Sequence, residues 1–271
     1  LLFLLKLVVG ILGNSTALIA DAMHTLSDIA SSVVVFIGFV IGEKPADESH
    51  PFGHGDVESI AGLMVAVLIG IIGFEVARST VERVYFKKFV VPATMALAVA
   101  FISILSQEVM ARYVSEVGKE INSPSLIADA AHHRSDALSS IIVFFSIIGA
   151  KAGYPVLDPL AGFVVSLLIL KVAYDVGREN IDLLTGKVMD KDLIERIKDI
   201  ATLVEGVEGI HSVKVHYIGA YARVELHIEV DREMRVIEAD RVAHRVQGQV
   251  IKNLEVVKTA LVHVCPKKGQ E

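Results

Sequence analysis

Cysteine is almost absent from the sequence, since Cys265 is the only one among 271 residues. A single thiol cannot form a disulfide within the chain, so a fold held together by disulfides is excluded. Charged residues are also scarce at 21%, whereas hydrophobic residues make up 53% and the mean hydropathy is +0.56. These values lie outside the range of ordinary soluble domains and favour a chain that lies partly in a lipid bilayer.

The sequence also lacks any excess of basic residues. The formal net charge is -6, and the lysines and arginines are scattered along the chain rather than clustered. Nucleic-acid-binding surfaces are typically basic and concentrated on one face. We therefore expect no nucleic acid among the partners of this protein.

The apolar residues fall into six separate runs. The first, residues 1–12, has no basic start and is shorter than the roughly 20 residues that cross a bilayer. We interpret it as the end of a first membrane helix rather than as a signal peptide. The other runs occupy residues 16–42, 57–82, 90–114, 123–150 and 156–184. The sequence thus predicts an all-α membrane region of six helices, whose two ends lie on the same side of the bilayer.

The pattern changes after these runs. Apolar residues recur at helical spacing in 192–203 and 236–251, and they alternate with period two in 211–218, 221–230 and 256–264. The order αββαβ predicts a small α+β domain of ferredoxin-like kind that lies in water. We therefore expect two domains, a transmembrane domain over residues 1–186 and a metal-binding or dimerisation domain over residues 187–271.

One pattern of titratable residues occurs twice within the predicted membrane helices. Residues 18–32 read LIADAMHTLSDIASS and residues 126–140 read LIADAAHHRSDALSS, with ten of fifteen positions identical at an offset of 108. Residues four apart share one face of a helix, so each copy presents one imidazole and one carboxylate together. The residues concerned are His24 and Asp28 in the first copy, and His132 and Asp136 in the second.

The predicted depth and direction of the two copies bring these side chains together. Each histidine lies ten residues, or about 15 Å, from a polar break at Asn14 or Asn122, near the middle of a bilayer about 30 Å thick. If helices four to six duplicate helices one to three, the odd number of crossings inverts the second copy. His24 would then lie beside Asp136, and two imidazoles with two carboxylates suit tetrahedral Zn²⁺.

A purely structural role is the alternative for these residues. Polar side chains in membrane helices often join helices through hydrogen bonds. However, two carboxylates buried without a cation would cost several kcal/mol, so four such residues at one depth favour a metal site. Asp21 and Asp129, three residues before each histidine, are candidates to orient the two imidazoles.

Together these features resemble the cation diffusion facilitator family of divalent-metal transporters. The resemblance also rests on the loop PADESHPFGHGDVES at residues 45–59, on DPLAG at residues 158–162 and on the αββαβ tail. It implies a homodimer in the cell membrane, with cytoplasmic termini, that exports a metal ion in exchange for protons. The expected cargo is zinc, and the expected surroundings are membrane lipid.

The resemblance implies two further metal sites. Three residues match a site in the loop between the second and third helices: Asp47, His50 and His54. Three others match a cluster in the cytoplasmic domain: His211, His227 and His263. The ligands of this cluster stay open because three residues nearby depart from the family pattern or offer further donors: Asp240, His244 and Cys265. Asp56 stands where a basic residue often forms a charge pair between subunits, so the existence of such a pair stays open here.

Three other functions compete with zinc export. The first is export of manganese, iron, cobalt, nickel or cadmium by the same fold, although imidazole ligands favour zinc over the harder ions. The second is a metal-dependent hydrolase in the membrane, which would need a general base as in H-E-x-x-H, a motif that the sequence lacks. The third is a metal sensor without transport. We expect neither enzymatic activity nor an organic cofactor.

Overall fold

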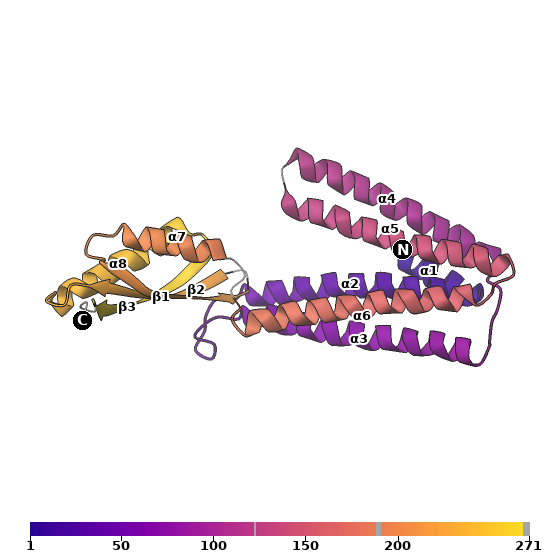
Figure 1. The fold of residues 1–271 in the computed structure, drawn as a ribbon, viewed down its shortest axis with the longest axis horizontal. Coiled ribbons are helices and arrows are strands. Elements are labelled where there is room, and N and C mark those ends of the chain that lie inside the picture. Colours follow the sequence, from indigo (N-terminus) through magenta and orange to yellow (C-terminus); the bar gives the residue numbers. More distant parts are fainter. Residues whose placement is uncertain (122, 188–190, 220, 268–271) are drawn as a thin grey trace. The chain divides into compact units, whose positions relative to one another are not determined.

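The computed structural model describes residues 1–121, 123–187, 191–219 and 221–267, and six helices precede a small α+β part (Figure 1). The six helices are α1 (Leu2–Leu12), α2 (Thr16–Gly42), α3 (Asp56–Tyr85), α4 (Thr94–Glu120), α5 (Pro124–Lys151) and α6 (Leu157–Leu184). They agree with the six predicted runs to within six residues at every boundary. The polar break at Asn122 lies outside the described residues, as do residues 188–190 beside the predicted domain boundary.

Within the described residues, four helices are long and apolar enough to cross a membrane by themselves, namely α2, α3, α4 and α6. The remaining two helices differ from these for separate reasons. α1 has only 11 residues. α5 is long enough, but its first half carries the titratable residues of the second repeat, which lower its hydropathy. The prediction of six helical runs is confirmed, whereas a membrane span is supported by composition alone for four of them.

The chain forms two compact units, which divide three of the long helices. The first unit contains Leu1–Val33 and Met64–Val176, and the second contains Val34–Leu63 and Gly177–Glu271. Helices α2, α3 and α6 therefore each run from one unit into the other. The two copies of the repeated pattern lie in the first unit, whereas the loop between α2 and α3 lies in the second.

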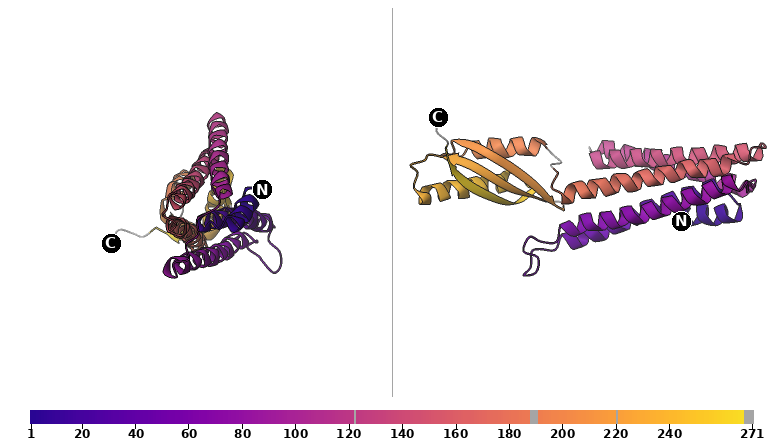
Figure 2. Two further views of the ribbon diagram at one scale, coloured as in Figure 1. Left: turned by 90° about the vertical axis from the view of Figure 1, so that its right-hand side faces the viewer. Right: turned by 60° about the horizontal axis from the view of Figure 1, so that its bottom comes forward.

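The sequence repeat is also a repeat of structure. In the first copy the amide of Ser15 donates to the carbonyl of Gly10 at 3.0 Å, and in the second the amide of Ser123 donates to that of Gly118 at 2.8 Å. A Cβ added at Gly10 would lie 3.1 Å from the amide nitrogen of Ile19, and one at Gly118 would lie 3.2 Å from that of Ile127. Both connections, from α1 to α2 and from α4 to α5, thus depend on the same close approach. The second pair forms a long hairpin of adjacent helices (Figures 1 and 2).

The C-terminal part has the predicted order of elements. It contains α7 (Lys191–Thr202), β1 (Gly209–Ile218), β2 (Tyr221–Val230), α8 (Val236–Asn253) and β3 (Val257–Pro266). The sheet has the order β1-β2-β3, in which β1 and β2 are antiparallel and β2 and β3 are parallel. The prediction of an α+β domain of this kind is confirmed.

Alternation along β2 separates a buried face of the sheet from an accessible one. Val224, Leu226 and Ile228 are buried in a core that also contains apolar residues of α7 and α8. Since successive side chains point to opposite faces of a strand, His227 lies on the other face, away from both helices. The helices thus cover one face of the sheet and leave the histidines of the opposite face free to bind a ligand.

Candidate metal centres

Helices α2 and α5 bring imidazole and carboxylate groups together inside the first unit. Nε2 of His24 lies 3.4 Å from Oδ1 of Asp136, and both side chains are buried. The inverted arrangement of the repeats predicts this pair of neighbours. Ligand atoms of His24, Asp28 and Asp136 all lie within 4.8 Å of one another. Ligands of one tetrahedral zinc ion are roughly 3.3 Å apart when each is about 2.0 Å from the metal, so these three residues can share an ion.

The fourth predicted ligand, His132, lies at the rim of this group. Its Nε2 is 3.9 Å from Oδ2 of Asp136 on the same helix, and its side chain is 49% exposed. It does not belong to the set of ligand atoms within 4.8 Å of one another. The structure therefore brings three of the four predicted ligands together and places the fourth one helical turn from Asp136.

Asp21, the carboxylate that precedes His24, does not orient its imidazole as predicted. Asp21 bonds to residues of α1 and α5 instead, and Nδ1 of His24 has no hydrogen-bond partner within the part of the chain that the structure describes. Asp129 is half exposed, and its Oδ2 lies 3.8 Å from Nε2 of His133. The prediction is wrong for Asp21 because a lysine and two serines take up its oxygens.

Sequence reasoning missed that lysine, Lys6. Its ammonium lies 2.8 Å from Oδ2 of Asp21 and also donates to Oγ1 of Thr25 at 3.1 Å. The signal was available, because Lys6 is the one charged residue in the apolar run over residues 1–12. A charged group in such a run is costly unless it is paired, so its presence there indicates a partner.

A second missed residue is Asp158, which had been noted only as part of the DPLAG stretch. Its carboxylate accepts hydrogen bonds from Oγ of Ser15 and from the amide of Thr16, both at 2.6 Å. The amide groups of the first turn of a helix have no partner within the helix. Asp158, at the start of α6, therefore caps the start of α2.

The loop between α2 and α3 gathers its three predicted ligands. Nδ1 of His50 lies 3.1 Å and Nε2 of His54 lies 3.5 Å from the carboxylate oxygens of Asp47. The same carboxylate accepts hydrogen bonds from the backbone amides of His50 at 2.6 Å and Ser49 at 2.9 Å. These bonds, that from the His50 amide foremost, hold the pKa of Asp47 below its usual range. The loop thus presents an ionised carboxylate beside two imidazoles.

The accessible face of the C-terminal sheet carries a third group. β2 and β3 pair so that His227 lies opposite His263, with 4.8 Å between ring centroids, and Cys265 follows on the same face. Sγ of Cys265 is 3.8 Å from Nδ1 of His227, and ligand atoms of these three residues lie within 4.8 Å of one another. A thiolate and two imidazoles are suitable ligands for zinc.

His211, the remaining predicted ligand of this cluster, lies beside the group without joining it. A β-bulge between Ile210 and Ser212 removes His211 from the pairing with β2. Its ring centroid is 6.2 Å from that of His227, and its Nδ1 lies 3.9 Å from a carboxylate oxygen of Glu229. Cys265 thus shares with His227 and His263 the set of ligand atoms within 4.8 Å of one another, and His211 is outside that set.

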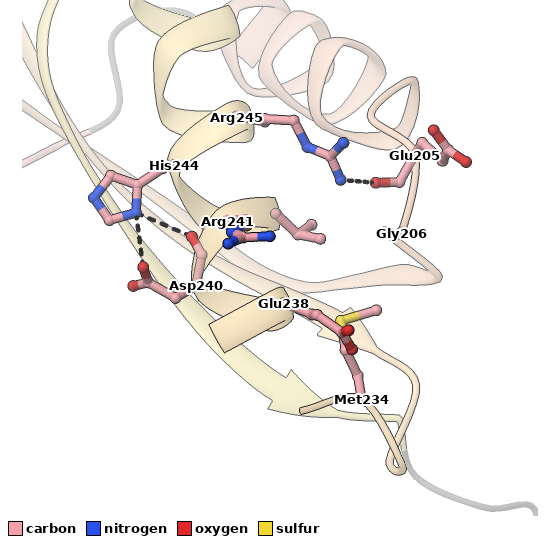
Figure 3. Close-up of a pocket in the computed structure, with 9 residues that line it drawn as sticks. Glu205, Gly206, Met234, Glu238, Asp240, Arg241, His244 and Arg245 are labelled. Carbon is pink, nitrogen blue, oxygen red and sulfur yellow. Dashed lines mark hydrogen bonds and ion pairs between the residues drawn. The ribbon is translucent and has the colours of Figure 1, made fainter. Parts of the chain in front are cut away.

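Asp240 and His244 line a different surface of the domain. They line a cavity of about 810 Å³ beside α8, together with Glu205 and Arg241. Figure 3 shows these side chains on and beside α8. Nδ1 of His244 lies 3.0 Å from the carbonyl oxygen and 3.5 Å from Oδ2 of Asp240, one turn earlier on the same helix. Of the three residues that left the cytoplasmic ligand set open, the geometry favours Cys265.

Comparisons with known proteins agree over nearly the whole chain. Residues 1–185 match the family model of the cation efflux transmembrane domain, and residues 189–267 match that of the cation efflux protein cytoplasmic domain. An uncharacterized transporter of Methanocaldococcus jannaschii is 39% identical over 264 residues, which cover 97% of this chain and 93% of that protein.

Two further relatives have assigned names. Magnetosome protein MamB of Magnetospira sp. is 31% identical, with 96% of this chain and 89% of that protein covered. Manganese efflux system protein MneS of Bacillus subtilis is 32% identical, with 97% and 90% covered. A solved cadmium form of the MamM C-terminal domain is 26% identical over 29% of this chain and 98% of that chain, with a TM-score of 0.28.

Proposed function

Because this chain belongs to the cation diffusion facilitator family of metal efflux transporters, we propose that it exports zinc across the cell membrane in exchange for protons. Members of this family are transporters rather than enzymes, and they combine a membrane-spanning region with a cytoplasmic C-terminal domain. The proposed transport site consists of His24, Asp28, His132 and Asp136. The observation that carries the proposal is the 3.4 Å distance between Nε2 of His24 and Oδ1 of Asp136, across α2 and α5.

Protons and metal compete for the same atoms at this site. A metal ion binds neutral imidazole and ionised carboxylate, so its arrival displaces any proton held by His24, Asp28 or Asp136. Protons that enter from the opposite side of the membrane would in turn release the metal. Exchange then requires two conformations of the helix bundle that open the site to different sides, each stabilised by one of the two ligands.

Manganese is the second candidate cargo, and the position of His132 supports it. Without His132 the group has one nitrogen donor and two carboxylate donors. This set of ligands is harder and binds manganese more readily than a set with two imidazoles. With His132 it becomes a set of two nitrogen and two oxygen donors, which favours zinc. The name of the relative MneS, a manganese efflux system protein, is a reason to test both ions.

The second unit supports a regulatory role for the other two groups. We propose that Asp47, His50 and His54 bind metal at the cytoplasmic end of α2 and α3. We further propose that a second site binds metal in a cytoplasmic domain that covers residues 187–271. Its ligands are His227, His263 and Cys265, and His211 lies beside them. This domain matches a family model for cytoplasmic domains of cation efflux proteins, which supports pairing with a second copy of the chain.

Metal flux into proteoliposomes tests the proposal. The full chain is reconstituted in lipid vesicles, and uptake of zinc, manganese, iron, cobalt, nickel and cadmium is measured with and without an imposed pH gradient. We expect zinc to give the fastest uptake and expect the rate to rise with the proton gradient. Equal rates with and without the gradient would contradict proton exchange, and faster manganese uptake would replace zinc as the cargo. Metal binding without any uptake would instead support the sensor function.

A further inference from the structure

A buried ion pair lies one helical turn from the proposed transport site. Nζ of Lys6 is 2.8 Å from Oδ2 of Asp21, and each side chain is only 1% exposed. We propose that Lys6 and Asp21 are positioning residues, which hold α2 and α5 at the spacing that lets His24 and Asp136 share one metal ion. This inference rests on the transport function proposed above.

The carboxylate of Asp21 joins three helices. Lys6 reaches it from α1, and Ser139 and Ser140 reach it from α5. Oγ of Ser140 donates to Oδ2 at 3.0 Å, and Oγ of Ser139 lies 3.4 Å from Oδ1. The ammonium of Lys6 also donates to Thr25 on α2. Each of these contacts is an ion pair or a hydrogen bond, which has a preferred direction. Apolar contacts have no such preference and would let the helices slide past one another.

These contacts lie next to the metal ligands on both helices. Asp21 precedes His24 by three residues on α2, and Ser139 and Ser140 follow Asp136 by three and four residues on α5. Three or four residues correspond to about one helical turn, or roughly 5 Å. Because α2 and α5 meet at both places, a shift between them that breaks the Asp21 contacts also separates His24 from Asp136.

Stability alone does not account for a charged pair at this position. Removal of an ammonium and a carboxylate from water costs free energy, and apolar residues of similar size in place of a buried pair often leave stability unchanged or higher. What apolar residues would not reproduce is the directed contact between the carboxylate and the two serines of α5. The pair therefore contributes to the geometry of the site.

The positions related to this junction by the repeat offset do not repeat the arrangement, and they provide matched controls. At the offset of 108, Val114 stands in place of Lys6, and Asp129 stands in place of Asp21. Asp129 is half exposed. Ser32, the counterpart of Ser140, donates to a backbone carbonyl of its own helix at 3.0 Å. Substitutions at these positions change the same residue types at equivalent places without touching the three-helix junction.

The test measures KM and Vmax for metal uptake by the reconstituted full chain at a fixed pH gradient. In the double variant Lys6→Met with Asp21→Asn, which leaves no unpaired charge, we expect KM to rise about 10- to 100-fold, the range found when residues that support a metal site from outside its ligands are lost. We expect Ser140→Ala to raise KM less. The matched variants Ser32→Ala and Asp129→Asn should leave KM within about twofold, since neither residue touches the junction. Lys6→Arg, which keeps the charge, should lie closer to the unsubstituted protein than Lys6→Met.

Asp136→Ala, measured in parallel, separates failure of this inference from failure of the proposed function. If Asp136→Ala transports normally, the site itself is misassigned. If Asp136→Ala is inactive while the folded double variant keeps an unchanged KM, the positioning role is overturned. Should the double variant fail to elute as a single folded species, the comparison of Ser140→Ala with Ser32→Ala decides, because equal KM values in these two would overturn the inference as well.

Discussion

Sγ of Cys265 on β3 lies 3.8 Å from Nδ1 of His227 on β2. The cytoplasmic group of candidate ligands (His227, His263 and Cys265) therefore contains a sulfur donor. The membrane group (His24, Asp28 and Asp136) lacks one. Thiolates select zinc and cadmium over manganese, whereas carboxylates accept all three ions. The donor chemistry therefore makes the cytoplasmic group the more selective of the two. If this group binds metal as proposed, we expect zinc rather than manganese to fill it in a cell that contains both ions.

We predict that zinc stabilises the domain over residues 187–271 when it is expressed alone, since this domain has its own apolar core. Metal at 100 times its Kd stabilises a folded domain by about 2.7 kcal/mol if the unfolded chain does not bind it. Zinc should thus raise the Tm and shift the domain toward a dimer in sedimentation. His227→Ala should weaken both effects, and His244→Ala should not. If zinc changes neither quantity in the unsubstituted domain, these histidines are ordinary surface residues.

Cys265→Ser should discriminate between metals at the same group. Replacing the thiol with a hydroxyl removes the soft donor and leaves the two imidazoles in place. We expect the affinity for zinc to fall by more than the affinity for manganese, and the zinc-induced rise in Tm to shrink with it. Calorimetric titration with both metals checks this, and His211→Ala serves as the neighbouring control. Unchanged zinc affinity in Cys265→Ser would place the thiol outside the ligand set.

Asp28→Ala and Asp136→Ala should each abolish metal transport while the protein still folds. Each substitution removes one carboxylate from a group of donors that lie within 4.8 Å of one another. The matched control is Asp129→Ala, which removes an exposed carboxylate from α5. Initial rates of zinc flux provide the measurement. Transport at the normal rate in either ligand variant would remove this group from the mechanism.

His24→Asp should shift selectivity toward manganese. The substitution replaces a buried nitrogen donor with an oxygen donor and so weakens the preference of the site for zinc. We expect the ratio of zinc flux to manganese flux to fall, with manganese flux itself preserved. An unchanged ratio would show that selectivity arises elsewhere in the transport path.

We predict a pH dependence for the loop between α2 and α3, which can be measured at the carboxyl group of Asp47. Backbone amides of His50 and Ser49 stabilise the ionised form of Asp47, so its pKa lies below the ordinary value of 3.8. The hydrogen bonds that order the loop are therefore fully formed at neutral pH. They are lost only as the pH falls through the lowered pKa of Asp47. Nuclear magnetic resonance of the labelled carboxyl carbon should show a midpoint below 3.8, and Asp47→Asn should shift the His50 amide signal at neutral pH. A midpoint above 3.8 would contradict the hydrogen bonds seen here.

Period and order in the sequence were sufficient to predict the helices and the αββαβ domain, because burial of one face imposes those periods. The pairing of His227 with His263 was not predictable in this way. It depends on the parallel register of β2 and β3, which alternation alone does not determine. The position of His211 beside this pair was not predictable for a similar reason, since a bulge of one residue removes it from the register and leaves no mark in the pattern.

The membrane group shows the same limit in another form. Spacing on one helix placed His24 and Asp28 together, and the inverted repeat placed Asp136 beside them. Identical residue types in the two copies suggested identical roles for Asp21 and Asp129, yet one is buried in a junction and the other is half exposed. This difference arises because Lys6 pairs with Asp21, whereas Val114 occupies the equivalent position in the second half. A comparison limited to residues that both copies share does not include Lys6.

Gly10 and Gly118 impose the same steric requirement on the two repeated halves of the membrane region, whatever charged groups each half carries. At each position a Cβ would lie within about 3 Å of the following helix, at Ile19 or at Leu126, so both halves must keep the smallest residue to preserve the helix contact. The titratable residues nearby are under no such constraint. The two halves can therefore differ in their charged groups, as they do at Lys6 and Val114, while both keep the same close helix contact.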